Sequence, residues 1–596
     1  MRLDVTNVEA TAGDYQVDLV TEGAAEVSAS SHKLNLAANA RRGLTLDLIG
    51  KGVGPASLSV RISGPDGLSI ERKYTLLTRP AFPAIERRTV RELARGESIV
   101  IDSNLLADVV PGTGALSITV SPQNGIDVPS LLVALDRYPY GCSEQITSRA
   151  LPLLYVNELA QENQLALDKS IDERIKEAIT RVLARQNSEG AFGLWSSSSA
   201  ADTWLHAYVT DFLTRAREKG FSVPEAQFKL ALNKLRNAVQ LGSNRGGDQN
   251  TEAIAYALYV LARNGVAPVG DLRYLADAKL EDLVTPLSRG QLAAALSLHG
   301  DKLRAEKVFN AALEVLPRDE LAPVAGRDDY GSPLRDAAGI VAVATEAGVE
   351  NTVRVALTRL QLARAVTPHT STQENAWMVL AARAFAREAQ RVSLSIDGTE
   401  HKGNYFRTIR STDLQGKTIR IANNGDRPVQ VVIGIRGAPV DAEPAAEKGF
   451  KISRTYRMLD GTPIADVTKV TQNERMVVVL RAVPTELVAG RLLLVDFLPA
   501  GFEIDNPRLV AGGKTGNLKW LGQMSETGPS EFRDDRFVAA FDRRDGDKNP
   551  IAVAYIVRAV SPGKYAHPPA MIEDMYRPDR FARTEAGTLE VVPASR

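Results

Sequence analysis

The sequence predicts a multidomain protein of mixed all-β and all-α class, in which a helical domain is inserted into a β-sandwich. Two observations predict this fold class. The chain has 596 residues, and single hydrophobic cores stop growing near about 250–300 residues, so several domains are expected. Alternating apolar residues indicate strands toward both ends of the chain, whereas Ala/Leu-rich segments near helical period fill the middle.

Residues 1–83 and 84–125 are predicted to form two small β-units. Apolar and polar residues alternate in both, which is typical of half-buried strands. The alternating apolar residues are Leu58, Val60 and Ile62 in the first unit and Leu116, Ile118 and Val120 in the second. The sequence Gly-Pro-Asp-Gly at 64–67 indicates a turn, and the proline-containing stretch 78–83 indicates the boundary between the units.

Residues 126–389 are predicted to form a helical domain. About eleven or twelve Ala/Leu-rich segments, separated by loops that contain Gly, Pro or Asn, fit paired helices that close into an α/α toroid. Examples of these segments are 174–184, 202–219, 225–241, 251–263, 290–299, 305–316, 353–365 and 373–387.

Strand patterns resume after residue 390. Because β segments flank the helical domain, 84–125 and 390–440 are predicted to be two halves of one sandwich, and such insertions are feasible where chain ends lie close together. The stretch 441–446 is a predicted linker, and residues 441–596 are predicted to form a final β-domain. The alternating apolar residues are Val392, Leu394 and Ile396, followed by Val429, Val431, Ile433 and Ile435.

Charge and hydropathy argue against two classes of partner. Lys plus Arg and Asp plus Glu are both 72, so no net field attracts nucleic acid or an anionic membrane surface. The longest apolar runs are far too short to span a membrane, and the first four residues begin no signal peptide. We therefore expect either a cytosolic protein or a piece of a longer exported chain.

Cys142 is the only cysteine, so it cannot form an internal disulfide. A lone thiol is either an inert buried hydrophobe or a reactive group, and composition does not separate the two. Gln145 places a carboxamide three positions after it. The pentapeptide Gly141-Cys142-Ser143-Glu144-Gln145 resembles the internal thioester motif Gly-Cys-x-Glu-Gln of the alpha-2-macroglobulin and complement family. In that family the cysteine sulfur attacks the glutamine carbonyl, ammonia leaves and a strained thiolactone remains.

The chemistry needs these residue types at this spacing. A carboxamide is a poor acyl donor, whereas a thioester has a weakly basic sulfur leaving group, so its formation turns Gln145 into an electrophile for amines and hydroxyls. Within 146–160, apolar residues recur near helical period at Ile146, Ala150, Leu153, Leu154 and Leu159. Pro152 is best tolerated in the first turn of a helix. Cys142 then precedes a helix N-terminus, where the helix dipole favours the thiolate.

The order of the predicted units is similar to the C-terminal part of bacterial alpha-2-macroglobulins. The resemblance implies a macroglobulin-like β-domain (1–83), a split CUB-like domain (84–125 and 390–440), an inserted α/α-toroid thioester domain (126–389) and a C-terminal macroglobulin-like domain (441–596). Further similar segments are 186–195, 202–205, 371–374 and 573–578. The family's earlier macroglobulin domains and bait region do not precede this segment, and Ser143 stands where complement and animal macroglobulins have Gly. We therefore expect a fragment or a shortened relative.

A thioester survives only while water and amines are excluded, so an apolar cover is expected over Cys142 and Gln145. The resemblance implies that Met575 and Tyr576 of the terminal domain form part of this cover. Tyr140 and Trp195 are candidates to complete it from the helical domain. Glu144 either orients the motif through hydrogen bonds or is a solvated carboxylate at the helix start.

The resemblance implies a broad-spectrum protease inhibitor rather than an enzyme. Its target proteases would cut a bait region and then be captured through lysine or hydroxyl groups. The resemblance also implies a monomer in the periplasm, anchored to the inner membrane by a lipid on an N-terminal part, and association with a penicillin-binding protein. No cofactor is expected, and a metal site is not expected because the six histidines are scattered.

Two alternatives of other classes stay open. A cysteine-dependent amidase or transglutaminase-type enzyme would use Cys142 as a nucleophile, with a histidine base in reach and repeated turnover. A scaffold or adhesion module would keep the fold without a functional thioester.

Overall fold

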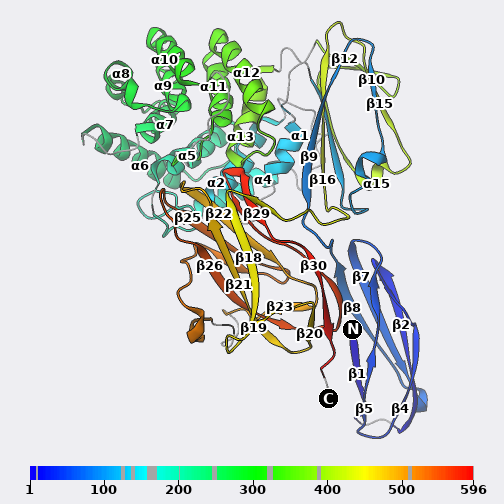
Figure 1. Ribbon diagram of the computed structural model, residues 1–596. Helices are drawn as coiled ribbons and strands as arrows, with labels where there is room; N and C mark the ends of the chain where they lie inside the picture. Colours follow the sequence, from blue (N-terminus) through cyan, green and yellow to red (C-terminus); the bar gives the residue numbers. More distant parts are fainter. Residues whose placement is uncertain are drawn as a thin grey trace.

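The computed structural model describes residues 1–8, 11–121, 126, 128–135, 141–156, 171–200, 202–244, 251–317, 327–385, 391–507, 513 and 515–594. Four bodies follow one another in colour in Figure 1: a blue β-unit, a blue and yellow-green β-sandwich, a green helical domain, and a yellow-to-red β-domain that lies against the helices. Among the described residues, no helix has the length and apolar character needed to cross a membrane.

The first unit is a small sandwich built around the alternation predicted from the sequence. Leu58 and Val60 of its strand β7 are almost fully buried against Val17 and Leu19 of β2. The sheet order is β4-β2-β7-β8, with the pairs β1-β5 and β3-β6 beside it. The strands are β1 (Arg2–Thr6), β2 (Gly13–Gly23), β3 (Ala25–Val27), β4 (Ser31–Leu36), β5 (Arg41–Thr45), β6 (Leu48–Gly50), β7 (Gly54–Ser63) and β8 (Ser69–Thr78).

The second sandwich combines strands from both sides of the helical residues. Its two sheets have the orders β14-β11-β16-β9 and β10-β15-β12-β13, so β11 lies between two strands that come almost 300 residues later in the chain, Tyr405–Arg410 and Val429–Gly437. Leu116, Ile118 and Val120 of β11 are fully buried in its core. The strands are β9 (Ile85–Leu93), β10 (Ser98–Ile101), β11 (Ala115–Ser121), β12 (Ser393–Ile396), β13 (Thr399–Lys402), β14 (Tyr405–Arg410), β15 (Ile419–Asn423) and β16 (Val429–Gly437).

The helices of the described region alternate between fully buried and amphipathic. Those buried on all sides form an inner layer, and those with one solvent face form an outer layer, as expected from their hydrophobic patterns. The inner helices are α2 (Ser143–Ala150), α5 (Thr203–Glu218), α7 (Thr251–Arg263), α9 (Pro286–Leu298), α11 (Pro333–Ala347) and α13 (Thr372–Ala381). The outer helices are α4 (Ile171–Leu183), α6 (Glu225–Asn244), α8 (Val269–Ala278), α10 (Lys302–Val315) and α12 (Glu350–Ala365), and α1 (Val128–Ala134) precedes them.

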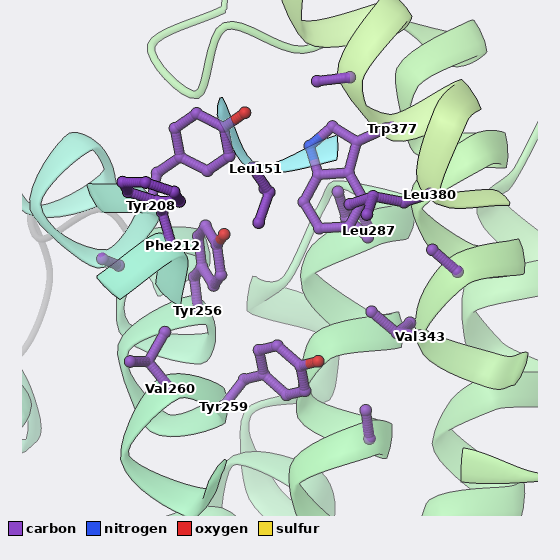
Figure 2. Close-up of a cluster of buried hydrophobic side chains, with 14 of the residues drawn as sticks. Leu151, Tyr208, Phe212, Tyr256, Tyr259, Val260, Leu287, Val343, Trp377 and Leu380 are labelled. Carbon is purple, nitrogen blue, oxygen red and sulfur yellow. The ribbon is translucent and has the colours of Figure 1, made fainter. Parts of the chain in front are cut away.

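The inner helices close into a ring. Each contacts the next, α2 with α5, α5 with α7, and so on to α13, which returns to α2. Their shared core is rich in aromatic residues, and Figure 2 shows Tyr208, Tyr256, Tyr259 and Trp377 pointing into it from α5, α7 and α13. This closure is the geometry of an α/α toroid, and it makes α2 a member of the buried ring.

Two details differ from the helices expected from sequence. The helix expected over 146–160 ends at Ala150, because Pro152 has no N–H to donate, and a short 3-10 helix follows at Pro152–Tyr155; residues 157–160 lie outside the described residues. The α-helix expected over 373–387 ends at Ala381 and a 3-10 turn follows at Ala382–Phe385; residues 386 and 387 lie outside the described residues. The predicted domain boundaries stay predictions, because strand pairing groups elements without fixing the residue at which a domain ends.

The terminal domain is a larger β-sandwich. Its sheets have the orders β17-β29-β28-β22-β25-β24 and β19-β18-β21-β26-β23, with β20-β30-β27 beside them. The hairpin of β28 and β29 carries Met575 and Tyr576 in its turn. The strands are β17 (Ala446–Lys448), β18 (Phe450–Met458), β19 (Pro463–Ile464), β20 (Lys469–Thr471), β21 (Arg475–Pro484), β22 (Gly490–Phe497), β23 (Phe502–Ile504), β24 (Ser530–Phe532), β25 (Arg536–Arg543), β26 (Ile551–Ala559), β27 (Gly563–His567), β28 (Ala570–Asp574), β29 (Arg577–Arg583) and β30 (Gly587–Val592).

Candidate functional site: the Cys142–Gln145 pair

The side chains of Cys142 and Gln145 meet because they form a capping box at the start of α2. Cys142 is the N-cap residue, and the Gln145 N–H donates to its Sγ at 3.4 Å. In return the Cys142 N–H donates to Gln145 Oε1 at 3.3 Å. A capping box normally uses Ser or Thr with Glu or Gln three residues on. Here the same helix geometry holds a thiol against a carboxamide.

The backbone before and within this cap is fixed by its neighbours. Gly141 has φ +58°, a left-handed conformation that favours glycine, and a Cβ at that position would lie 2.6 Å from the Arg181 guanidinium and displace it. Ser143 binds the loop that precedes α5: its N–H donates to Leu194 O at 2.8 Å and its hydroxyl to Gly193 O at 2.6 Å. The start of α2 therefore has little freedom to move relative to that loop.

The loop at 186–195 is itself rigidly folded. The Asn187 side chain accepts from the N–H groups of Glu189 and Ala191, both at 3.0 Å, and Gln186 Nε2 donates to Gly190 O at 3.1 Å. The segment thus supports Ser143 through the carbonyls of Gly193 and Leu194 and leads into Trp195.

Cys142 is almost completely buried, with 1% of its surface exposed. The pKa of the thiol is raised to about 12. Burial is the largest cause and the neighbouring Glu144 carboxylate is the second, whereas the backbone N–H of Gln145 opposes the rise. The sequence predicted that the helix N-terminus would favour the thiolate. In the closed structure desolvation outweighs that effect, because the charged form loses its water.

Glu144 is fully buried rather than solvated. Its carboxylate accepts hydrogen bonds from Ser148 Oγ (2.5 Å), Gln373 Nε2 (2.8 Å), Thr372 Oγ1 (3.1 Å) and Tyr576 Oη (2.6 Å). The first three donors belong to α2 and to the start of α13, and the fourth belongs to the terminal domain. Glu144 thus contacts three parts of the chain that are far apart in sequence.

The terminal domain covers the Cys142–Gln145 pair. Met575 is 3% exposed, and Gln145 Nε2 donates to its Sδ at 3.5 Å. Trp195 packs against Met575 and the outer face of β22 and β25. In Figure 1 the red strand β29 reaches α2, in agreement with these contacts. Tyr140, the remaining predicted cover residue, lies outside the described residues.

A small cavity of about 10 Å³ remains beside the sulfur. It is lined by residues of both domains, among them Cys142, Trp195, Arg491, Met575 and Tyr576. A volume of this size is at the lower limit for one water molecule. The pair is therefore enclosed with almost no room for solvent.

Aromatic and charged contacts extend the domain interface around Tyr576. Its ring meets the Tyr330 ring edge-on, with centroids 4.9 Å apart. The Arg491 guanidinium lies 3.8 Å above the Tyr330 ring centroid and 3.8 Å from the Asp202 carboxylate. Sequence reasoning did not assign a role to Arg491 or Tyr330, and a single sequence carries no signal for either.

The histidines and acidic residues of the described region do not gather into a metal-binding group. His206 is buried in the toroid, where its Nε2 lies 3.0 Å from Ala231 O, and burial lowers the pKa of its ring to about 4. Among the described residues that line the cavity next to Cys142, none is a histidine.

Two family models match the chain. Residues 119–243 match the TED domain of the A-macroglobulins, and residues 449–579 match the MG10 domain of bacterial alpha-2-macroglobulin. The alpha-2-macroglobulin of Escherichia coli K12 is 30% identical over 99% of this chain, and that of Xylella fastidiosa Temecula1 is 29% identical over 99%. The chain spans 37% of the length of each of these curated relatives.

Solved structures of bacterial alpha-2-macroglobulins are also similar to this chain. Native Escherichia coli alpha-2-macroglobulin, in a structure spanning domain MG7 to the C-terminus, is similar with a TM-score of 0.84 and 28% identity, covering 99% of this chain and 96% of that one. The Salmonella protein reacted with methylamine is similar with a TM-score of 0.82 and 30% identity, covering 99% of this chain and 39% of that one.

The toroid beside its β-sandwiches defines a macroglobulin-type protein with a TED domain, and the predicted fold class is confirmed. The chain matches a TED domain and an MG10 domain, and over nearly its whole length it is similar to part of the bacterial alpha-2-macroglobulins.

Proposed function

We propose that the protein is a broad-spectrum protease inhibitor in which Cys142 and Gln145 form an internal thioester. After a protease cuts a bait segment and the domains rearrange, the thioester captures the protease covalently. The capping box carries this proposal, because it holds the buried thiol against the buried carboxamide where two domains meet. The family of the relatives supports it.

Formation of the thioester needs only these two side chains. Cys142 Sγ attacks the Gln145 carbonyl carbon, an S–C bond forms, the C–N bond breaks, and the nitrogen leaves as ammonia with the thiol proton. The Cys142 N–H, 3.3 Å from Oε1, donates to the oxygen that becomes negative in the tetrahedral intermediate. The local helix geometry thus supplies both proximity and one stabilising donor.

Capture is the reverse acyl transfer to a new nucleophile. A lysine amine of the protease attacks the same carbon, a C–N bond forms, and the C–S bond breaks. The sulfur takes the electron pair and then the amine proton, so that Cys142 ends as a thiol. Nothing regenerates the thioester, so the reaction has a single turnover and the protein is not an enzyme.

Intact mass spectrometry of freshly purified protein, with and without methylamine, tests the proposal. We expect a mass one ammonia below that of the sequence, a thiol that becomes titratable only after methylamine treatment, and addition of one methylamine at Gln145. The Cys142→Ala variant is the control and should have its full mass. A full mass with a free thiol from the outset would contradict the proposal and favour a scaffold module, whereas repeated turnover on a peptide amide would favour a cysteine-dependent enzyme.

The family resemblance is also the support for the proposed surroundings of the protein. We propose a periplasmic location with a lipid anchor on a preceding part of the chain, a CUB-like identity for the split sandwich, a monomeric state, and association with a penicillin-binding protein. Fractionation of cells that express the full-length protein tests the location.

A further inference from the structure

Glu144 lies where the thioester helix, the start of α13 and the terminal domain meet. All four of its hydrogen-bond partners can donate: the hydroxyls of Ser148, Thr372 and Tyr576 and the amide of Gln373. An ionised carboxylate has enough lone pairs to accept all four of these bonds. The arrangement of donors therefore accommodates a carboxylate.

No ion pair of the described residues involves this carboxylate, so its charge is balanced only by hydrogen bonds. Three of those bonds come from its own domain. The fourth, from Tyr576 Oη at 2.6 Å, crosses the domain interface and is the bond that a departing terminal domain would break. Hydrogen bonds to charged groups are roughly twice as strong as those between neutral groups.

The Tyr576 side chain is held in place from its own side of the interface. The Tyr576 N–H donates to Asp574 Oδ1 at 3.0 Å, and Arg577 pairs with the same carboxylate at 2.5 Å. The pKa of the Tyr576 phenol lies well above its usual range, mainly because the group is buried and secondly because Glu144 is close. The phenol therefore stays protonated and remains the donor. A rigid turn therefore delivers one hydroxyl to one buried carboxylate.

The same carboxylate lies beside the sulfur that must leave during capture. Glu144 is two residues from Cys142, and its charge is the second cause, after burial, of the raised pKa of the thiol. Any negative charge that develops on Cys142 Sγ as the C–S bond breaks is opposed by the Glu144 charge in a medium of low dielectric constant, and the Arg185 guanidinium, whose effect on the thiol is smaller, only partly offsets it. While the terminal domain covers the site, burial and the Glu144 charge thus disfavour departure of the sulfur as a thiolate.

We propose that Glu144 is a positioning residue that couples docking of the terminal domain to the reactivity of the thioester, an inference that rests on the proposed function. In the closed state its charge retards departure of the sulfur, while its bond to Tyr576 holds the cover in place. Loss of that bond opens the site, and water then reaches both the carboxylate and the sulfur. The repulsion is screened, and attack by an amine proceeds with the bond changes given above.

Two variants separate the two parts of this role. Tyr576→Phe removes the interdomain bond but leaves the charge. Glu144→Gln removes the charge, and its side-chain carbonyl can still accept from Tyr576. Tyr565→Phe is the matched control, since Tyr565 donates only to backbone carbonyls of its own domain, at Ser561 and Pro562. The readouts are the rate of methylamine uptake by intact mass spectrometry and hydrogen exchange of the β28–β29 turn.

We expect Tyr576→Phe to raise both the uptake rate and the exchange of the turn, each by roughly tenfold or more, because a bond to a charged group is lost. Glu144→Gln should raise the uptake rate by a similar factor with a much smaller rise in exchange. Tyr565→Phe should match the wild type. If Glu144→Gln forms no thioester, Tyr576→Phe decides alone.

A wild-type rate in both variants, in a protein whose ammonia loss proves the thioester, would overturn the inference while leaving the proposed function intact. A wild-type protein without ammonia loss would instead overturn the proposed function and the part of the inference that concerns reactivity. The part that concerns docking would then be judged from hydrogen exchange in Tyr576→Phe, where an unchanged turn refutes it.

Discussion

Two helices of the toroid begin with the same cap built from different atoms. At the start of α13 the Glu374 N–H donates to Ser371 Oγ at 3.2 Å and the Ser371 N–H donates to Glu374 Oε2 at 2.7 Å. At the start of α2, Cys142 and Gln145 make the same two bonds. A hydroxyl and a carboxylate can only exchange hydrogen bonds, whereas a thiol and a carboxamide can condense. Two side-chain changes thus separate an ordinary stabilising cap from one that holds the two groups of the proposed thioester together.

The two caps also differ in what covers them. Ser332 of the same domain closes the α13 cap by donating to Glu374 Oε1 at 2.5 Å. Met575 of the terminal domain closes the α2 cap. The first cover therefore moves only if the toroid unfolds, and the second moves whenever the two domains separate.

Cys142→Ser makes the α2 cap resemble the α13 cap and should have the largest effect. We expect complete loss of methylamine uptake with a change in stability within about 1 kcal/mol, because serine is a preferred N-cap residue. Intact mass and thermal unfolding measure the two. Ser371→Cys is the converse control: it sets a thiol against a carboxylate and should lose no ammonia beyond the one lost at Cys142 and Gln145. Uptake by Cys142→Ser would break the comparison.

Alkaline pH should weaken only the thiol-bearing cap. Burial raises the pKa of the Cys142 thiol to about 12. The neutral thiol therefore contributes its full stabilisation at any pH below about 8.5, the ordinary pKa of a thiol in the unfolded chain. As pH rises from there toward about 12, this contribution falls by up to about 1.4 kcal/mol per pH unit. Unfolding of methylamine-treated protein, compared with Cys142→Ser from about pH 8, just below the ordinary thiol pKa of about 8.5, to about pH 11, still below the raised pKa, measures the difference. Parallel curves would contradict the expectation.

Ser371→Ala removes the unreactive cap and should have the smallest effect. We expect the helical domain to lose about 1 kcal/mol of stability, the usual result of replacing an N-cap serine by alanine. Thioester formation should persist, since Cys142 and Gln145 are untouched. Denaturant unfolding and intact mass check the two expectations, and loss of the thioester would mean that the two helix starts depend on each other more strongly than their separate caps suggest.

The layout of the fold was predictable because it depends on local patterns. Alternation at Leu116, Ile118 and Val120 predicted a buried strand, and the toroid follows from repeated helical segments. Helix α11 was not among the example segments, although its pattern is no less helical than theirs.

The candidate site was predictable only in part. Cys142 and Gln145 lie three positions apart, within one helix turn, so the sequence alone shows that their side chains can meet. It does not show the partners of Glu144, because Gln373 and Tyr576 lie more than 200 residues away in the chain and only the fold brings them together. The Ser-x-x-Glu pattern at 371–374 is typical of a capped helix start, but it does not indicate which residue the cap would face.

The central position of β11 bears on how the protein would carry a mechanical load. If a protease were attached to Gln145 as proposed, a force on it would be transmitted along the chain back to β11. β11 is paired in register on one side with β14 and on the other with β16. Tension along it is therefore shared by two rows of hydrogen bonds loaded in shear, which must fail together before the strand slides out.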